Sequence, residues 1–138
     1  MKQTNEAVKL EKARIMIVDD QADMRAMIKN MLSELGVTQI FEAADGKQAL
    51  MFIDDALDLI DIIICDWNMP NMSGVEVLRQ LRSVDGGIPF LMVTGRSDLV
   101  SVTEAKASGV TAYISKPFSL DQLENKLKVI LNKVAKIG

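Results

Sequence analysis

Five short apolar runs alternate with five segments of helical periodicity along this chain of 138 residues. The apolar runs predict strands at residues 14–18, 39–43, 61–65, 90–93 and 112–114. Residues 15–18 and 62–65 are apolar at every position, which is typical of strands covered on both faces. The alternation therefore predicts an α/β fold, a doubly wound five-stranded parallel sheet with helices on both faces.

Four of the helical segments carry a clear apolar stripe. The first ends at Gly36, and the second runs from about Gly46 to Asp55. Capping boxes, Ser73 with Glu76 and residues 119–122, begin the third and the last. The predicted core-facing residues are Met24, Met27, Ile28, Met31, Leu32 and Leu35 in the first helix, Ala49, Leu50 and Ile53 in the second, Val77, Leu78 and Leu81 in the third, and Leu123, Leu127, Ile130, Leu131 and Val134 in the last.

The fourth helical segment, from about Asp98 to Ser108, is the weakest. Its stripe consists of only Leu99, Val102 and Ala105. Because so little apolar area anchors it, we expect this helix to move most readily.

Composition excludes several classes of function. A net charge of −3 does not favour nucleic-acid binding, and no apolar stretch is long enough to insert into a membrane. Cys65, the only cysteine, lies in an apolar run, so no disulfide forms, and we expect a cytoplasmic protein. Residues 1–12 are polar and predict an N-terminal extension, a loose tail or short helix, before one domain at 13–138.

Charged and polar residues follow the strands at the ends where parallel strands meet. Asp19 and Asp20 follow the first strand, Asp66 the third, Thr94 the fourth and Lys116 the fifth. Three carboxylates at one sheet edge repel one another unless a cation or shifted pKa values relieve the repulsion. Histidine is absent, so oxygen ligands and Mg²⁺ are favoured. This set of residues suits phosphoryl transfer to a carboxylate.

Each residue also has a purely structural interpretation. Asp19, Asp20 and Asp23 could cap the first helix, and we expect Asp23 to serve only this purpose. Capping needs only one carboxylate of the adjacent pair Asp19 and Asp20, so the other is left unexplained. Asp66 could be a turn residue before residues 68–70. Thr94-Gly95 and Lys116 are unremarkable taken singly, and Trp67 is interpreted as a packing residue.

Five motifs in order identify a family resemblance. The runs that carry it are Ile-Val-Asp-Asp at 17–20, which supplies two acidic positions, Asp-Trp-Asn-Met-Pro-Asn-Met at 66–72, Val-Thr-Gly at 93–95 and Ser-Lys-Pro-Phe at 115–118. Over residues 14–136 the sequence resembles the response-regulator receiver domain, and within it the single-domain chemotaxis regulators. The resemblance implies a flavodoxin-like strand order, 2-1-3-4-5.

The same resemblance implies the roles of the acidic residues. Asp66 would be the phosphoacceptor. Asp20 and Asp66, together with the backbone carbonyl of Asn68, would bind Mg²⁺, and Asp19 would assist through water.

The later motifs would respond to the phosphoryl group. Thr94 would bond one phosphoryl oxygen and Lys116 would pair with another, and the Lys116–Pro117 peptide bond would be cis. Tyr113 would switch between exposed and buried rotamers as Thr94 moves toward the phosphoryl group, although Tyr113 could equally be a half-buried strand aromatic.

The expected partners follow from the family. A histidine kinase would be the phosphodonor, and the surface of the fourth helix, fifth strand and fifth helix would control a protein target such as the flagellar motor switch. We expect a monomer that catalyses only its own phosphorylation and dephosphorylation and, with no output domain after Lys136, acts by docking. Asp98 and Leu99 stand where motor-binding relatives carry lysines, although Lys106 and Lys126 keep the surface partly basic. A phosphorelay shuttle or kinase adaptor therefore stays open, and Asn68 and Arg96 would set the hydrolysis rate.

Two other classes fit less well. A phosphatase of the haloacid dehalogenase type needs an Asp-x-Asp pair after the first strand, where this chain has Gln21 in the second position. A flavodoxin-like cofactor binder needs a Ser, Thr or Gly-rich phosphate loop there. Residues 19–23 carry three carboxylates and would repel a phosphate.

Overall fold

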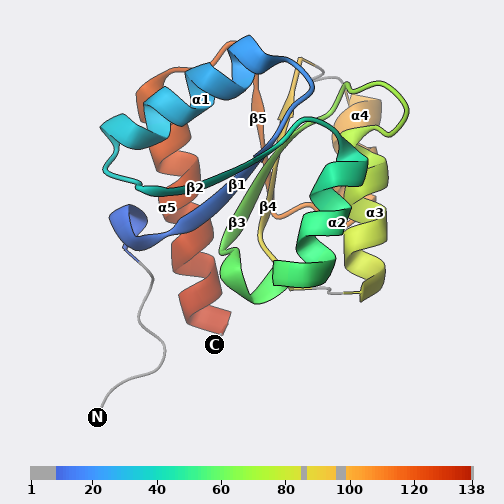
Figure 1. Cartoon of the computed structure of the whole chain (residues 1–138). Helices are drawn as coiled ribbons and strands as arrows, with labels where there is room; N and C mark the ends of the chain where they lie inside the picture. Colours follow the sequence, from blue (N-terminus) through green and yellow to red (C-terminus); the bar gives the residue numbers. More distant parts are fainter. Residues whose placement is uncertain (1–8, 85–86, 96–98, 138) are drawn as a thin grey trace.

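The computed structural model describes residues 9–84, 87–95 and 99–137 (Figure 1). One parallel sheet has the order β2-β1-β3-β4-β5, which confirms the predicted topology. The strands are β1 (Arg14–Val18), β2 (Gln39–Ala43), β3 (Ile62–Asp66), β4 (Phe90–Thr94) and β5 (Ala112–Ser115). The helices are α1 (Ala22–Glu34), α2 (Gly46–Ala56), α3 (Gly74–Val84), α4 (Leu99–Ala107) and α5 (Leu120–Ile137), with 3-10 turns η1 (Leu10–Lys12) and η2 (Leu57–Leu59).

The sheet is covered on both faces, with α1 and α5 on one side and α2, α3 and α4 on the other (Figure 1). Successive strand residues point to opposite faces of the sheet, so each buried strand contributes side chains to two hydrophobic cores. Met16, Ile63 and Phe90 pack with α2, α3 and α4, whereas Ile15 and Ile64 pack with α1 and α5. This double burial explains why residues 15–18, 62–65 and 90–93 of the central strands are all apolar. No described helix has both the length and the hydropathy that a membrane span requires.

The predicted helix ends have the expected local contacts. In α3 the Glu76 amide donates to Ser73 Oγ at 3.2 Å, and the Ser73 amide donates to Glu76 Oε1 at 3.2 Å. Residues 119 and 122 repeat this reciprocal pair at the start of α5. Gly36, with φ of 92°, follows α1 in the left-handed conformation that ends many helices.

The third strand lies one residue later than predicted, at Ile62–Asp66 instead of 61–65. Asp61 precedes the strand: its amide donates to the Arg14 carbonyl at 2.8 Å, and its carboxylate accepts hydrogen bonds from the backbone amide and guanidinium of Arg14. Asp66 instead pairs in register with Val93. The fourth and fifth strands likewise each continue one residue further, to Thr94 and Ser115.

Two predictions of buried side chains were wrong. Leu99 is 80% exposed, and α4 buries the small residues Ser101 and Ala105 instead. Because those residues offer little apolar area, α4 is also held by Arg79 of α3, which pairs with Glu104 at 3.0 Å. Met27 in α1 is 37% exposed. Asp98, Arg96 and the side chain of Val134 lie outside the described part of the chain.

Candidate functional site

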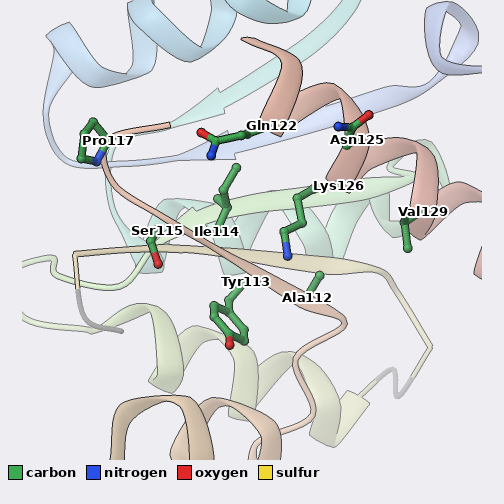
Figure 2. A pocket seen from close by; sticks show the side chains of 9 residues that line it. All are labelled: Ala112, Tyr113, Ile114, Ser115, Pro117, Gln122, Asn125, Lys126 and Val129. Carbon is green, nitrogen blue, oxygen red and sulfur yellow. The ribbon is translucent and has the colours of Figure 1, made fainter. Parts of the chain in front are cut away.

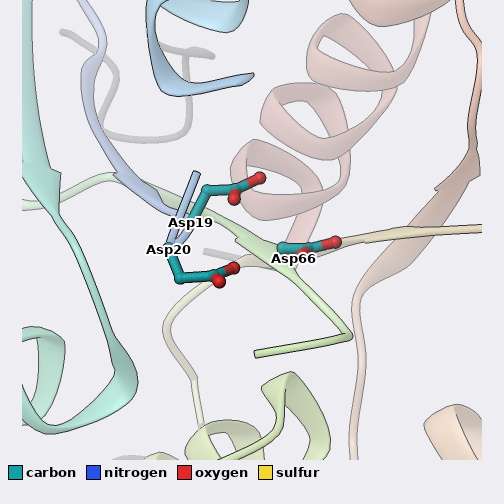
Figure 3. A group of neighbouring side chains, drawn as sticks. All are labelled: Asp19, Asp20 and Asp66. Carbon is teal, nitrogen blue, oxygen red and sulfur yellow. The ribbon is translucent and has the colours of Figure 1, made fainter. Parts of the chain in front are cut away.

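Three carboxylates meet at the carboxyl end of the sheet. Asp19 and Asp20 follow β1, Asp66 ends the neighbouring β3, and one oxygen of each lies within 4.8 Å of the others (Figure 3). Asp19 is 1% exposed and Asp66 is 5% exposed, whereas Asp20 lies at the surface. The pairing of β1 with β3 brings these residues together, although 45 intervening residues separate Asp20 from Asp66.

Asp19 is only partly used by local structure. Its Oδ1 accepts a hydrogen bond from the Gln21 amide at 2.8 Å, which supports the turn into α1. Its Oδ2 is buried and has no hydrogen-bond partner in the part of the chain that the structure describes. Burial raises the pKa of the Asp19 carboxyl, the Gln21 hydrogen bond lowers it, and the negative charge of Asp66 raises it further. This turn, and not a helix cap, explains one Asp19 oxygen, because the N-cap residue of α1 is Gln21 and no side-chain capping hydrogen bond forms there. The other oxygen faces no donor among the described residues.

Lys116 places a positive charge next to Asp66, the phosphoacceptor candidate. Its Nζ lies 2.8 Å from Asp66 Oδ1, outside the directions of an aligned hydrogen bond, so the contact is an ion pair. The Lys116 amide donates to the backbone oxygen of Thr94 at 2.8 Å, which ties the loop after β5 to the end of β4. The peptide bond to Pro117 is cis, as the family resemblance implied.

Thr94 is buried, with 1% of its surface exposed, at the last position of β4. In the sheet register Asp66 lies opposite Val93, and Thr94 lies opposite Ser115. Thr94 is therefore at the same sheet edge as the acidic cluster. Asn68 is exposed in the loop after β3, and its carbonyl as a metal ligand stays a prediction.

Gly74, which the sequence analysis did not single out, brings α3 against the cluster. Its amide donates to the Trp67 carbonyl at 2.8 Å. A Cβ at this position would overlap the backbone oxygen of Asp66 and lie 2.9 Å from Met92 Sδ. The sequence signal for this contact was the glycine directly after the capping Ser73. The start of α3 can approach the end of β3 this closely only if position 74 has no side chain. Trp67 is 5% exposed and packs in the core, as predicted.

Tyr113 belongs to a different part of the surface. It lies on β5 at the rim of a groove of about 600 Å³ between this edge strand and α5 (Figure 2). Lys126 of α5 places its Nζ 5.5 Å from the centre of the Tyr113 ring, a cation–π contact. The Tyr113 side chain is partly buried and packs against the hydrophobic core on the α2, α3 and α4 side of the sheet.

The donors of the acidic cluster fit a hard divalent cation. The cluster offers carboxylate oxygens only, and one of them, Asp19 Oδ2, is buried without a donor. Oxygen ligands of this kind suit Mg²⁺ better than zinc or copper. The cluster could therefore hold Mg²⁺ through Asp19, Asp20 and Asp66.

Comparison with known proteins agrees with this arrangement. The family model of the response regulator receiver domain matches residues 15–128. The chain is 39% identical over 123 residues to a chemotaxis protein CheY of Pseudomonas aeruginosa, a match that covers 88% of this chain and 98% of that protein. It is 36% identical to a chemotaxis protein CheY-3 of Vibrio cholerae, with 94% and 99% covered.

Solved structures give the same result. The Vibrio cholerae chemotaxis protein CheY4 has a TM-score of 0.80 at 34% identity, covering 86% of this chain and 98% of that chain. A response regulator receiver domain protein from Clostridium thermocellum has a TM-score of 0.84 at 25% identity, with 91% and 99% covered. The haloacid dehalogenase and cofactor-binding alternatives are therefore set aside. Sequence and fold together place this chain in the response regulator receiver domain family.

Proposed function

We propose that this protein is a phosphorylation-gated signalling module that accepts a phosphoryl group on Asp66 from a histidine kinase. The observation that carries the proposal is the surroundings of Asp66. Two further carboxylates lie beside it, and the Lys116 ammonium lies 2.8 Å from its Oδ1. Such a set of groups offers a nucleophile, a cation site and a fixed positive charge at one point.

The chemistry assigns a task to each residue. A carboxylate oxygen of Asp66 attacks the phosphorus of phosphohistidine, the phosphorus–nitrogen bond breaks, and the imidazole nitrogen takes the electron pair. Mg²⁺, held by Asp19, Asp20, Asp66 and the Asn68 carbonyl, would offset the repulsion between the carboxylates and the phosphoryl oxygens. Lys116 then pairs with one phosphoryl oxygen and the Thr94 hydroxyl donates to another.

The proposed output surface comprises α4, β5 and α5. A phosphoryl group adds a charge of about −1.5 to −2 at the site. Thr94 moves toward it, and the space that Thr94 leaves admits the Tyr113 ring. Leu99 is 80% exposed and Val129 is 50% exposed, so this surface offers apolar area for a partner.

Control of a flagellar motor in chemotaxis is the leading candidate for the output. Support comes from the relatives that are named chemotaxis proteins and that this chain covers over 98% or more of their length. Lys126 supplies a positive charge beside Tyr113 for an acidic target. A phosphorelay shuttle or kinase adaptor is the alternative, because Leu99 begins α4 in place of the lysines of motor-binding relatives.

Acetyl phosphate with Mg²⁺ tests the proposal directly. Mass spectrometry should show one added phosphoryl group per chain, and labelling should disappear in Asp66→Asn. Asp23→Asn is the matched control, because Asp23 lies in the first turn of α1 and does not belong to the acidic cluster. Repeated turnover of acetyl phosphate far faster than loss of the label would instead indicate a phosphatase. Labelling that survives in Asp66→Asn would refute Asp66 as the acceptor.

A second experiment tests the gating. Protein activated with beryllofluoride and Mg²⁺ should capture a partner from cell lysate that the untreated protein does not capture. Asp66→Asn should lose this difference. A partner retained equally with and without activation would show that binding is independent of phosphorylation.

A further inference from the structure

Arg25 of α1 connects three elements at the acidic cluster. Its Nη1 donates to the backbone oxygen of Asp19 at 2.6 Å, and its Nε lies 3.4 Å from Glu42 Oε1 on β2. The Arg25 side chain is 19% exposed, so water screens these contacts only in part. Lys29, one turn later in α1, also pairs with Glu42, at 3.3 Å, but forms no hydrogen bond or ion pair with Asp19.

The Asp19 backbone is consequently held from both sides. Its amide donates to the Ala43 carbonyl of β2 at 3.2 Å, and its carbonyl accepts from Arg25. That carbonyl belongs to the peptide unit that leads into Asp20. Fixing it restricts the direction in which the Asp20 side chain leaves the chain.

Asp20 needs such a restraint more than its neighbours. Asp19 and Asp66 are buried, and each has a partner, the Gln21 amide and Lys116 respectively. Asp20 is exposed, and no described residue donates a hydrogen bond to its carboxylate. Repulsion from the other two carboxylates favours rotation of Asp20 away from the cluster, so its backbone is what keeps it near.

We infer that Arg25 is a positioning residue for the cation site, which holds the Asp19–Asp20 peptide so that Asp20 faces the cluster before Mg²⁺ arrives. This inference rests on the proposed function, because it concerns the same site. Arg25 does not touch the phosphoryl group. It acts by lowering the conformational entropy that the loop loses when the cation binds.

Positioning and charge make opposite predictions for the loss of Arg25. A positive charge near the cluster repels a divalent cation, so charge removal alone tightens Mg²⁺ binding. Loss of the restraint on the loop weakens Mg²⁺ binding. Lys29→Gln also removes one positive charge from α1 and one contact with Glu42, but it leaves the hydrogen bond to the Asp19 carbonyl in place. It is therefore the matched control.

Titration calorimetry with Mg²⁺ measures the outcome. Arg25→Gln should weaken Mg²⁺ binding about fivefold, roughly the effect of one hydrogen bond. Lys29→Gln should leave it unchanged or tighter. Arg25→Lys, which can still donate to the Asp19 carbonyl, should stay within about twofold of the natural protein. At saturating Mg²⁺ the labelling rate of Arg25→Gln should recover, because the deficit lies in cation binding.

A measurement without metal separates positioning from general destabilisation. In metal-free Arg25→Gln, hydrogen exchange should accelerate at the Gln21 amide while the amides of β1 and β3 keep their protection. Uniform acceleration would indicate that Arg25 only stabilises the fold, and would overturn the inference. Should Arg25→Gln not fold, Glu42→Gln carries the test through hydrogen exchange, which should accelerate at the Gln21 amide by a smaller factor; Mg²⁺ affinity is not the readout for this variant, because loss of the Glu42 charge alone weakens cation binding.

The failure of this inference differs from that of the proposed function. If the natural protein binds Mg²⁺ and is labelled, but Arg25→Gln binds Mg²⁺ as tightly as Lys29→Gln, only the positioning role is refuted. If the natural protein takes up neither Mg²⁺ nor phosphate, the proposed function fails and the role of Arg25 fails with it.

Discussion

Lys116 Nζ lies 2.8 Å from Asp66 Oδ1, although the two residues come from the ends of β5 and β3, with β4 between them. The side chain of Lys116 is 27% exposed and that of Asp66 is 5% exposed. The ammonium therefore spans the end of β4 to reach a nearly buried carboxylate. Under the proposed function, Lys116 would compete with a cation for Asp66 and would pair with an incoming phosphoryl oxygen.

Lys116→Met should therefore change two properties in opposite directions. Mg²⁺ affinity should rise, because the competing positive charge is gone. The rate of labelling by acetyl phosphate at saturating Mg²⁺ should fall about 10²-fold, because a fixed positive charge is lost where negative charge develops. Calorimetry measures the Mg²⁺ affinity, and mass spectrometry measures the labelling rate. A variant with both properties unchanged would exclude Lys116 from the chemistry.

Asp19 should make metal-free stability depend on pH. The pKa of Asp19 is raised above its ordinary value of 3.8 in the folded protein, mainly by burial. The fold then binds this proton more tightly than the unfolded chain does, so the free energy of unfolding falls as pH rises through the folded pKa. Near neutral pH, Asp19→Asn should have a higher free energy of unfolding than the natural protein. The difference should disappear below pH 3.8, the ordinary pKa of this carboxyl.

Urea denaturation of both proteins without metal measures this dependence. Asp23→Asn, at an exposed position in the first turn of α1, serves as the control and should show no such gain. Mg²⁺ should stabilise the natural protein and have little effect on Asp19→Asn. Equal pH dependence in the natural protein and Asp19→Asn would refute the assignment to this carboxyl.

Gly74→Ala should disturb the site through the backbone. The added methyl group would overlap the Asp66 carbonyl oxygen and press on Met92, so α3 must shift outward. We expect a loss of about 1–3 kcal/mol in the free energy of unfolding, the usual range for overpacking. Slower labelling of Asp66 should accompany it. Gly95→Ala is the control, because a Cβ there meets no atom of the described residues within 4 Å.

Thr94→Ala should separate phosphorylation from output. Asp66 should still be labelled, but the Tyr113 ring should no longer change its surroundings on activation. Tyr113 is the only tyrosine in the sequence, so its ring signals in NMR spectra can be followed without ambiguity. The natural protein with beryllofluoride provides the reference shift. A full shift in Thr94→Ala would show that Tyr113 responds independently of Thr94.

The sequence predicted the fold because its signals are local. Continuous apolar runs place the strands, and the capping boxes at residues 73–76 and 119–122 place the starts of two helices. The rule that parallel strands meet at their carboxyl ends then groups Asp19, Asp20 and Asp66. The errors arose where local pattern and burial diverge. Leu99 continues an apolar stripe, yet α4 turns its small residues inward, and nothing in the spacing reveals this.

The sequence by itself determined the pattern of strands and helices, the sheet edge that carries the site and the residues that lie at that edge. Each of these depends on the polarity and size of a few neighbouring residues. Only the tertiary structure decided the 2.8 Å approach of Lys116 to Asp66, the close contact of Gly74 with β3 and the bridge from Arg25 to Asp19. These contacts depend on how elements distant in the chain pack against one another. A change of one ångström in helix placement decides whether they form, and no local pattern encodes that placement.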